Sequence, residues 1–150
     1  MNHGFYALIA LCLFLAVQVS VAQDRTFGLG VILGEPTGIS AKLWTSHDNA
    51  FDFGLGWANG GLVHIHMDYL WHSFSAIHSS ERFPLYYGIG GRMNSSSGNN
   101  AALAVRGVIG IAWLPRGTPI DVFLEVAPSL QLSPSSGFYV DAGLGARYFF

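Results

Sequence analysis

The chain has 150 residues, of which 51% are hydrophobic and only 11% are charged, and its formal net charge is −2. This length supports one domain, and so small a net charge does not imply a nucleic-acid partner. The low share of charged residues would supply a water-soluble surface poorly.

The first 22 residues have the pattern of a secretory signal peptide. An apolar run over residues 5–17 precedes the small-residue sequence Ser20-Val21-Ala22, which predicts cleavage before Gln23. A membrane anchor is the less favoured alternative, because the run is shorter than the ~20 residues that span a bilayer. Cleavage removes Cys12, the one cysteine, so residues 23–150 form a single domain without a disulfide, a thiol nucleophile or a cysteine-ligated metal.

Turn sequences divide the rest of the chain at short intervals. Clusters rich in Gly, Pro, Asn, Asp and Ser, such as Gly34–Gly38, Asn59–Gly61 and Pro115–Pro119, separate runs with a two-residue period. The predicted strands are residues 25–33, 38–45, 50–57, 62–72, 84–93, 101–114, 120–132 and 137–150. An even number of strands places both termini on one side, expected to be the periplasmic side, together with the longest connection, residues 73–84.

Charged residues within the predicted strands all share one face. On residues 63–69, for example, that face carries His64, His66 and Asp68, and the other face is apolar. The apolar rows have aromatic residues near their ends, as a lipid-facing surface with interfacial girdles requires. One such row reads Phe51, Phe53, Leu55 and Trp57. The pattern predicts an all-β fold, an eight-stranded antiparallel up-and-down transmembrane β-barrel.

The polar faces would then meet inside the barrel. An eight-stranded interior is just wide enough to be filled by side chains, and an unpaired buried charge is costly. We therefore expect a polar network that plugs the lumen and fixes the strand register; a narrow pore or a small-ligand pocket is the functional alternative. The network residues are Lys42, Asp52, His64, His66, Asp68, Arg92, Arg106, Asp121, Glu125, Asp141 and Arg147.

Two further patterns within the strands have structural explanations. Many inward positions are glycines, which would make room for large neighbours such as Tyr86 and Phe149, although a backbone-lined cavity is the alternative. His64, His66 and Asp68 would lie on one face of an extended strand, with each residue ~6.6 Å from the next of the three. A complete metal site would need a neighbouring strand, so the sequence predicts no metal and no cofactor.

The last eight residues, 143–150, resemble the targeting signal of bacterial outer-membrane barrels. Phe150 is a terminal aromatic residue, Tyr148 is aromatic two positions earlier, and Gly145 stands five residues before the end. In that family the barrel-assembly machinery reads this signal. The resemblance implies that Gly145, Tyr148 and Phe150 form an assembly signal and that the machinery and outer-membrane lipid are the partners.

Residues 23–150 are also similar to a family of short, uncharacterised outer-membrane barrels. The resemblance rests on residues 28–38 (GLGVILGEPTG), 84–92 (PLYYGIGGR) and 120–128 (IDVFLEVAP). This family carries no assigned activity, so the resemblance implies a location in the bacterial outer membrane and no chemistry.

Three functions remain open at this point. The favoured one is a small, non-enzymatic outer-membrane barrel with a structural or interaction role. The second is a lipid-modifying enzyme, because lipid A deacylases are barrels with a His and a Ser two residues apart, as are His78 and Ser80; here the neighbouring Glu81 would point the other way on a strand. The third is a soluble, lipocalin-like barrel for an apolar ligand, which requires the Phe and Trp rows to face inward.

Overall fold

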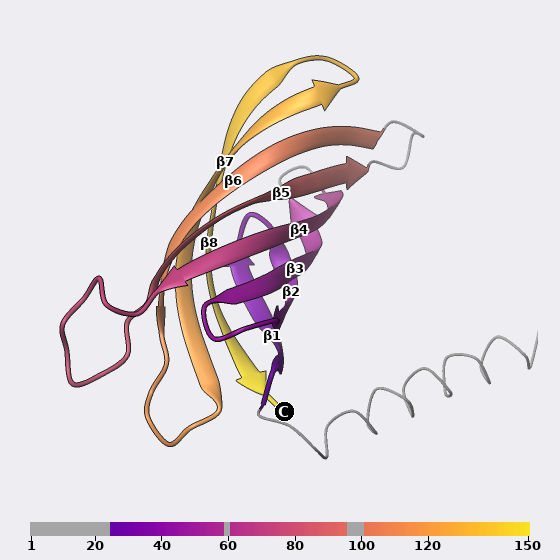
Figure 1. The fold of residues 1–150 in the computed structure, drawn as a ribbon. Coiled ribbons are helices and arrows are strands. Elements are labelled where there is room, and N and C mark those ends of the chain that lie inside the picture. The colour runs from indigo at the N-terminus through magenta and orange to yellow at the C-terminus, as the bar shows by residue number, and fades with distance from the viewer. Residues whose placement is uncertain (1–24, 59–60, 96–100) are drawn as a thin grey trace, which may run out of the picture.

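Strict alternation between polar and apolar residues folds the chain into a closed sheet (Figure 1). The computed structural model describes residues 25–58, 61–95 and 101–150, so the predicted signal peptide lies outside the described residues. Its strands are β1 (Phe27–Gly34), β2 (Thr37–Trp44), β3 (Asn49–Ala58), β4 (Leu62–Ser73), β5 (Leu85–Ser95), β6 (Ala101–Trp113), β7 (Ile120–Ser133) and β8 (Gly137–Phe149).

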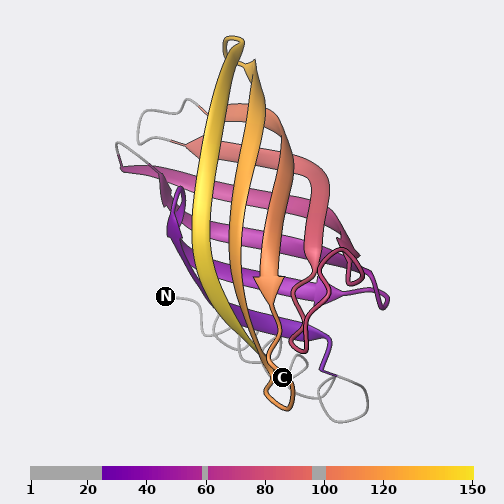
Figure 2. The same ribbon diagram turned by 90° about the vertical axis from the view of Figure 1, so that its left-hand side faces the viewer.

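Each strand pairs antiparallel with its neighbour in sequence, and β1 pairs with β8 to close the barrel. The predicted eight-stranded up-and-down topology is therefore confirmed, and every predicted strand limit falls within two residues of the observed one. Figure 2 shows the strands side by side and strongly tilted. Within the described residues, no helix is long and apolar enough to cross a bilayer.

The connections alternate between two ends of the barrel. The C-terminus lies at what we call the terminal end, with residues 45–48, 74–84 and 114–119. The other end, which we call the opposite end, includes residues 35–36 and 134–136. Strand length is uneven: β1 pairs with β8 only as far as Gly34 and Gly143. The β7–β8 hairpin therefore projects beyond β1 at the opposite end (Figure 2).

The outer face of the barrel is apolar apart from uncharged polar residues at strand ends, such as Thr37 and Asn49. No outward position of the eight described strands holds Asp, Glu, Lys, Arg or His. Large side chains are exposed there, including Val31, Ile65, Ile109 and Leu144. Aromatic residues gather near the ends of the strands; those exposed are Phe27, Trp57, Trp71, Tyr87, Trp113, Phe138, Tyr148 and Phe150.

The interior is packed by a few apolar side chains among many polar ones. Ile32, Leu70, Val108 and Phe123 form an apolar cluster inside the barrel. Inward glycines accept large side chains from the strand opposite: a Cβ atom on Gly28 would lie 2.7 Å from the Phe149 ring. Some inward glycines therefore make room for large neighbours, whereas others, such as Gly38 and Gly56, lie against neighbouring backbone.

Candidate functional site

All eleven residues expected in the polar network lie inside the barrel. None of these residues is more than 7% exposed, and Lys42, His64 and Asp121 are fully buried. They come from seven strands, β2 to β8, since alternation places their side chains on the inner face of each. Their contacts divide into three groups along the barrel.

Arg147 on β8 holds the first group together. Its Nη1 lies 3.2 Å from Asp52 Oδ1 and its Nε lies 3.0 Å from Asp121 Oδ1. Its Nη1 also donates to Ser40 Oγ at 3.2 Å. Lys42 adds a second, longer contact to Asp121, at 3.8 Å from Nζ to Oδ2. Two acids from different strands therefore share one guanidinium, and one of them, Asp121, also contacts the ammonium of Lys42.

Lys42 has a second partner, His72, that the sequence analysis did not include. The Lys42 ammonium can only donate, so His72 Nε2, at 2.8 Å from Nζ, is the acceptor. His72 Nδ1 then carries the proton and donates to the Asp48 carbonyl at 3.0 Å. His72 lies on the same face of β4 as His64, His66 and Asp68. The two-residue spacing of the sequence therefore already indicated that His72 faces the interior.

Arg106 on β6 forms the second group. Its Nε is 3.1 Å from Asp68 Oδ1, and its Nη2 is 3.6 Å from Glu125 Oε1. Tyr86 donates its hydroxyl to the other Glu125 oxygen at 2.7 Å. This group crosses the barrel from β4 to β7, so it ties together strands that are not neighbours.

The third group lies toward the opposite end. Arg92 on β5 forms an ion pair with Asp141 on β8, and its guanidinium lies 5.2 Å from the centre of the Tyr139 ring. Both partners of the ion pair line a cavity of about 350 Å³ with Glu35 and other residues. The ion pair therefore forms part of the wall of the cavity at this end of the barrel.

The histidines of β4 contact each other and do not form a metal centre. His64 Nε2 lies 2.9 Å from His66 Nδ1, and His66 Nε2 lies 3.9 Å from Asp68 Oδ2. Among the described residues, no three His, Cys, Asp or Glu side chains converge as metal ligands would. The neighbouring strands offer Gly54 and Arg92 at the positions paired with His66, and neither is a metal ligand.

Together these groups occupy the interior of the barrel. Each of the four interior bases contacts at least one of the five acids. Large, fully buried side chains, Arg106, Arg147, Tyr86, Lys42 and Phe123, occupy the barrel between its two mouths. Side chains therefore fill the interior, as expected for a barrel of eight strands.

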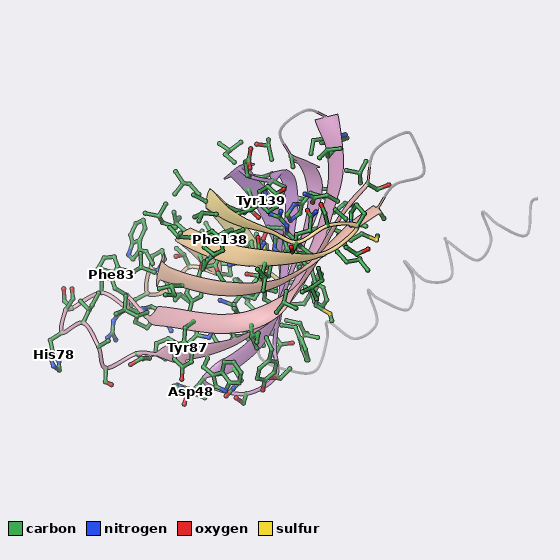
Figure 3. All side chains as sticks on the ribbon, turned by 90° about the horizontal axis from the view of Figure 1, so that it is seen from above. Asp48, His78, Phe83, Tyr87, Phe138 and Tyr139 are labelled. Carbon is green, nitrogen blue, oxygen red and sulfur yellow. The ribbon has the colours of Figure 1, made fainter. Side chains whose placement is uncertain are left out.

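The residues considered for an acyl-transfer site are not assembled into one. His78 and Ser80 lie in the exposed connection between β4 and β5, and Figure 3 places His78 at its tip, away from the barrel wall. Glu81 accepts a hydrogen bond from Trp113 Nε1 at 3.4 Å. Within the described residues no hydrogen bond joins His78 to Ser80 or Glu81, so the base has no orienting carboxylate.

The residues of the expected assembly signal lie on both faces of β8. Tyr148 and Phe150 point outward, with ring centres 5.3 Å apart. The Phe150 amide donates to the Phe27 carbonyl at 2.9 Å, which joins the end of the chain to β1. Gly145 faces inward, where a Cβ atom would collide with the Phe123 ring. Each residue therefore has a place in the folded barrel besides any role in targeting.

Comparison with known proteins supports the fold alone. No protein-family model matches the chain, and no curated protein matches it. A solved structure described as "De novo design of transmembrane beta-barrels" has a TM-score of 0.51 and 14% sequence identity, and the match covers 86% of this chain and 98% of that chain. The fold resembles that of a transmembrane β-barrel; membership of a family of short bacterial outer-membrane barrels stays a prediction.

Proposed function

We propose that this protein is a small, non-enzymatic integral β-barrel of the Gram-negative outer membrane, with a plugged lumen and a structural or interaction role. The observation that carries the proposal is the uncharged, apolar outer face with aromatic residues near its ends. Outer-membrane barrels have this outward apolar band and these girdles. A lipocalin-like barrel would need the Phe and Trp rows inside, whereas Phe27, Trp57 and Trp71 are exposed on the outer face.

The proposed partners follow from this location. Outer-membrane lipid would cover the apolar band, and the barrel-assembly machinery would insert the chain after removal of residues 1–22. No residue pattern supports a nucleic-acid partner. The plug supports a role that does not depend on conduction, since Arg106 and Arg147 fill the interior.

Cell fractionation followed by gel electrophoresis with and without boiling tests the proposal. We expect the protein in the outer membrane, with a mobility that shifts only on heating, because folded barrels of this kind resist detergent. Overexpression should leave the mass of lipid A unchanged, and planar bilayers containing the protein should show no conductance steps. A soluble periplasmic product, or altered lipid A, would contradict the proposal.

Deletion of Phe150 tests the proposed dependence on the assembly machinery. We expect less folded protein in the outer membrane of cells, while the purified variant should still fold into detergent micelles, since the deletion removes one hydrogen bond to Phe27. Phe138→Ala is the control, because Phe138 is exposed on the same strand but lies outside the expected signal. Equal assembly of the deletion variant and the intact chain would exclude this role for Phe150.

A further inference from the structure

The arginines outside the strands differ from those inside in having no acidic partner. Every interior base contacts an Asp or Glu. Arg25, Arg82 and Arg116 have no carboxylate within 4.0 Å among the described residues, although the whole chain carries net negative charge. All three line one cavity of about 1100 Å³ at the terminal end of the barrel. Positive charge is therefore concentrated in one place.

Two of these arginines are held by reciprocal hydrogen bonds between neighbouring connections. Arg82, after β4, donates from Nε to the Leu114 carbonyl at 3.2 Å. Arg116, after β6, donates from Nε to the Ser80 carbonyl at 3.0 Å. The Leu114 amide also donates to the Arg82 carbonyl at 2.9 Å. Among the described residues, no hydrogen bond uses the Nη groups of either guanidinium, so their Nη donors can bind another partner.

Beside polar side chains such as Thr45, Ser46 and His47, the rest of the cavity wall carries one group of large apolar residues. Trp44, Phe74, Ile77 and Phe149 line it, and the Trp44 and Phe74 rings lie 6.3 Å apart. Glu81 is the one acid among the lining residues, and it accepts a hydrogen bond from Trp113. The aromatic side of the cavity suits a ligand with a hydrocarbon part, and paired guanidinium groups suit phosphate or carboxylate oxygens.

We propose that this cavity binds an anionic amphiphile, with its phosphate or carboxylate on Arg82 and Arg116 and its hydrocarbon chain against Trp44, Phe74 and Phe149. The charge excess and the two guanidinium groups favour an anion over a neutral or cationic ligand, and the adjoining aromatic rings favour a hydrocarbon part. The three arginines of the site take no part in the interior ion pairs, although Trp44 borders both regions, with its ring 4.4 Å from Lys42 Nζ. The inference does not depend on the function proposed above.

Titration with hexyl phosphate tests the proposal on the folded barrel, held in a nonionic amphipol and labelled with ¹⁵N-arginine. We expect saturable shifts of the Nε–H signals of Arg82 and Arg116. Inorganic phosphate should bind at least tenfold more weakly, and hexanol should not shift these signals. Equal binding of inorganic phosphate and hexyl phosphate would indicate an adventitious anion only and would overturn the proposal.

Two charge variants complete this test. Thr118 lines the cavity without taking part in the arginine hydrogen bonds, so Thr118→Glu should weaken hexyl phosphate binding at least tenfold while leaving the two connections joined. Ser135→Glu adds the same charge at the opposite end and should leave affinity unchanged. Equal affinity in Thr118→Glu and the intact chain would overturn the proposal.

The source of the amphiphile is a separate question that the same signals answer. Nanodiscs of phosphatidylcholine with and without phosphatidylglycerol would be compared. If phosphatidylglycerol alone shifts the Arg82 and Arg116 signals, the ligand is a membrane lipid; if only added hexyl phosphate does, it is a free amphiphile. Absence of both shifts would reject the site.

Discussion

At the scale of single residues, the interior of this barrel is stabilised by pairing rather than by exclusion of charge. Removing an ion from water costs several kcal/mol, and only close partners and hydrogen bonds offset that cost. Arg147 is 1% exposed, yet it contacts Asp52, Asp121 and Ser40. It also lies 4.0 Å from the centre of the Phe123 ring. Among the described residues, Arg147 is the interior base that contacts two carboxylates at 3.2 Å or less.

Arg147→Met should lower the free energy of unfolding by about 3–5 kcal/mol, because it leaves two buried carboxylates with too few partners. Reversible urea unfolding in lipid vesicles would measure this loss. The triple variant Arg147→Met/Asp52→Asn/Asp121→Asn should recover much of it, since the unpaired charges are gone. Arg25→Met, at an exposed arginine, is the control. No loss in Arg147→Met would show that water already solvates these acids.

At the scale of strand pairs, a large inward side chain repeatedly faces a glycine on the neighbouring strand. This arrangement lets long side chains fill the narrow interior and makes a shift of register costly, because a shift would place two large groups together. The directly opposed pairs include Gly54 with His66, Gly110 with Tyr86, and Gly145 with Phe123. Glycine here supplies space rather than backbone freedom.

Gly54→Ala tests this arrangement. Its Cβ would lie 2.7 Å from both ring nitrogens of His66, so the ring must move, and a shift disturbs its contact with His64. We expect a loss of about 1–3 kcal/mol in the free energy of unfolding, and a smaller loss when His66 is already Ala. Gly91→Ala is the control, because the nearest atom to its Cβ is 3.7 Å away. Equal effects at Gly54 and Gly91 would contradict the space-filling role.

The sequence predicts features that depend on residues close together in the chain better than features that depend on distant ones. Alternation and turn residues are local, so they predicted eight strands and the inward face of each. Partners across the lumen depend on tilt and register around the whole barrel: the pairing of Arg92 with Asp141 rather than Asp68 has no local signal. For the same reason Arg82 and Arg116 read as separate turn residues, although the fold joins their connections.

At the scale of the whole molecule, the two ends of the barrel differ. Arg25, Arg82 and Arg116 all lie at the terminal end, together with the long connection between β4 and β5. In the described part of the opposite end, the connections carry Glu35 and no base. In the proposed orientation the terminal end faces the periplasm, so the amphiphile cavity would open toward the inner leaflet and not toward the cell exterior.

The apolar outer band predicts that lipid surrounds the barrel, and a substitution at Leu144 tests this prediction. Leu144 is 51% exposed and lies midway between Phe138 and Phe150 on the outer row of β8. In water, Leu144→Arg would change the free energy of unfolding by roughly 0.5 kcal/mol or less. In a bilayer, an arginine near the midplane costs about 2–4 kcal/mol.

We expect the larger loss in lipid vesicles, measured by urea unfolding. Leu132→Arg is the matched control, because Leu132 is 60% exposed near the tip of the β7–β8 hairpin, where an arginine should cost about 0–1 kcal/mol. A soluble barrel would tolerate both substitutions equally, and that result would contradict a lipid-facing band. A large difference between the two variants requires a medium whose polarity changes along the barrel axis, and a bilayer is such a medium.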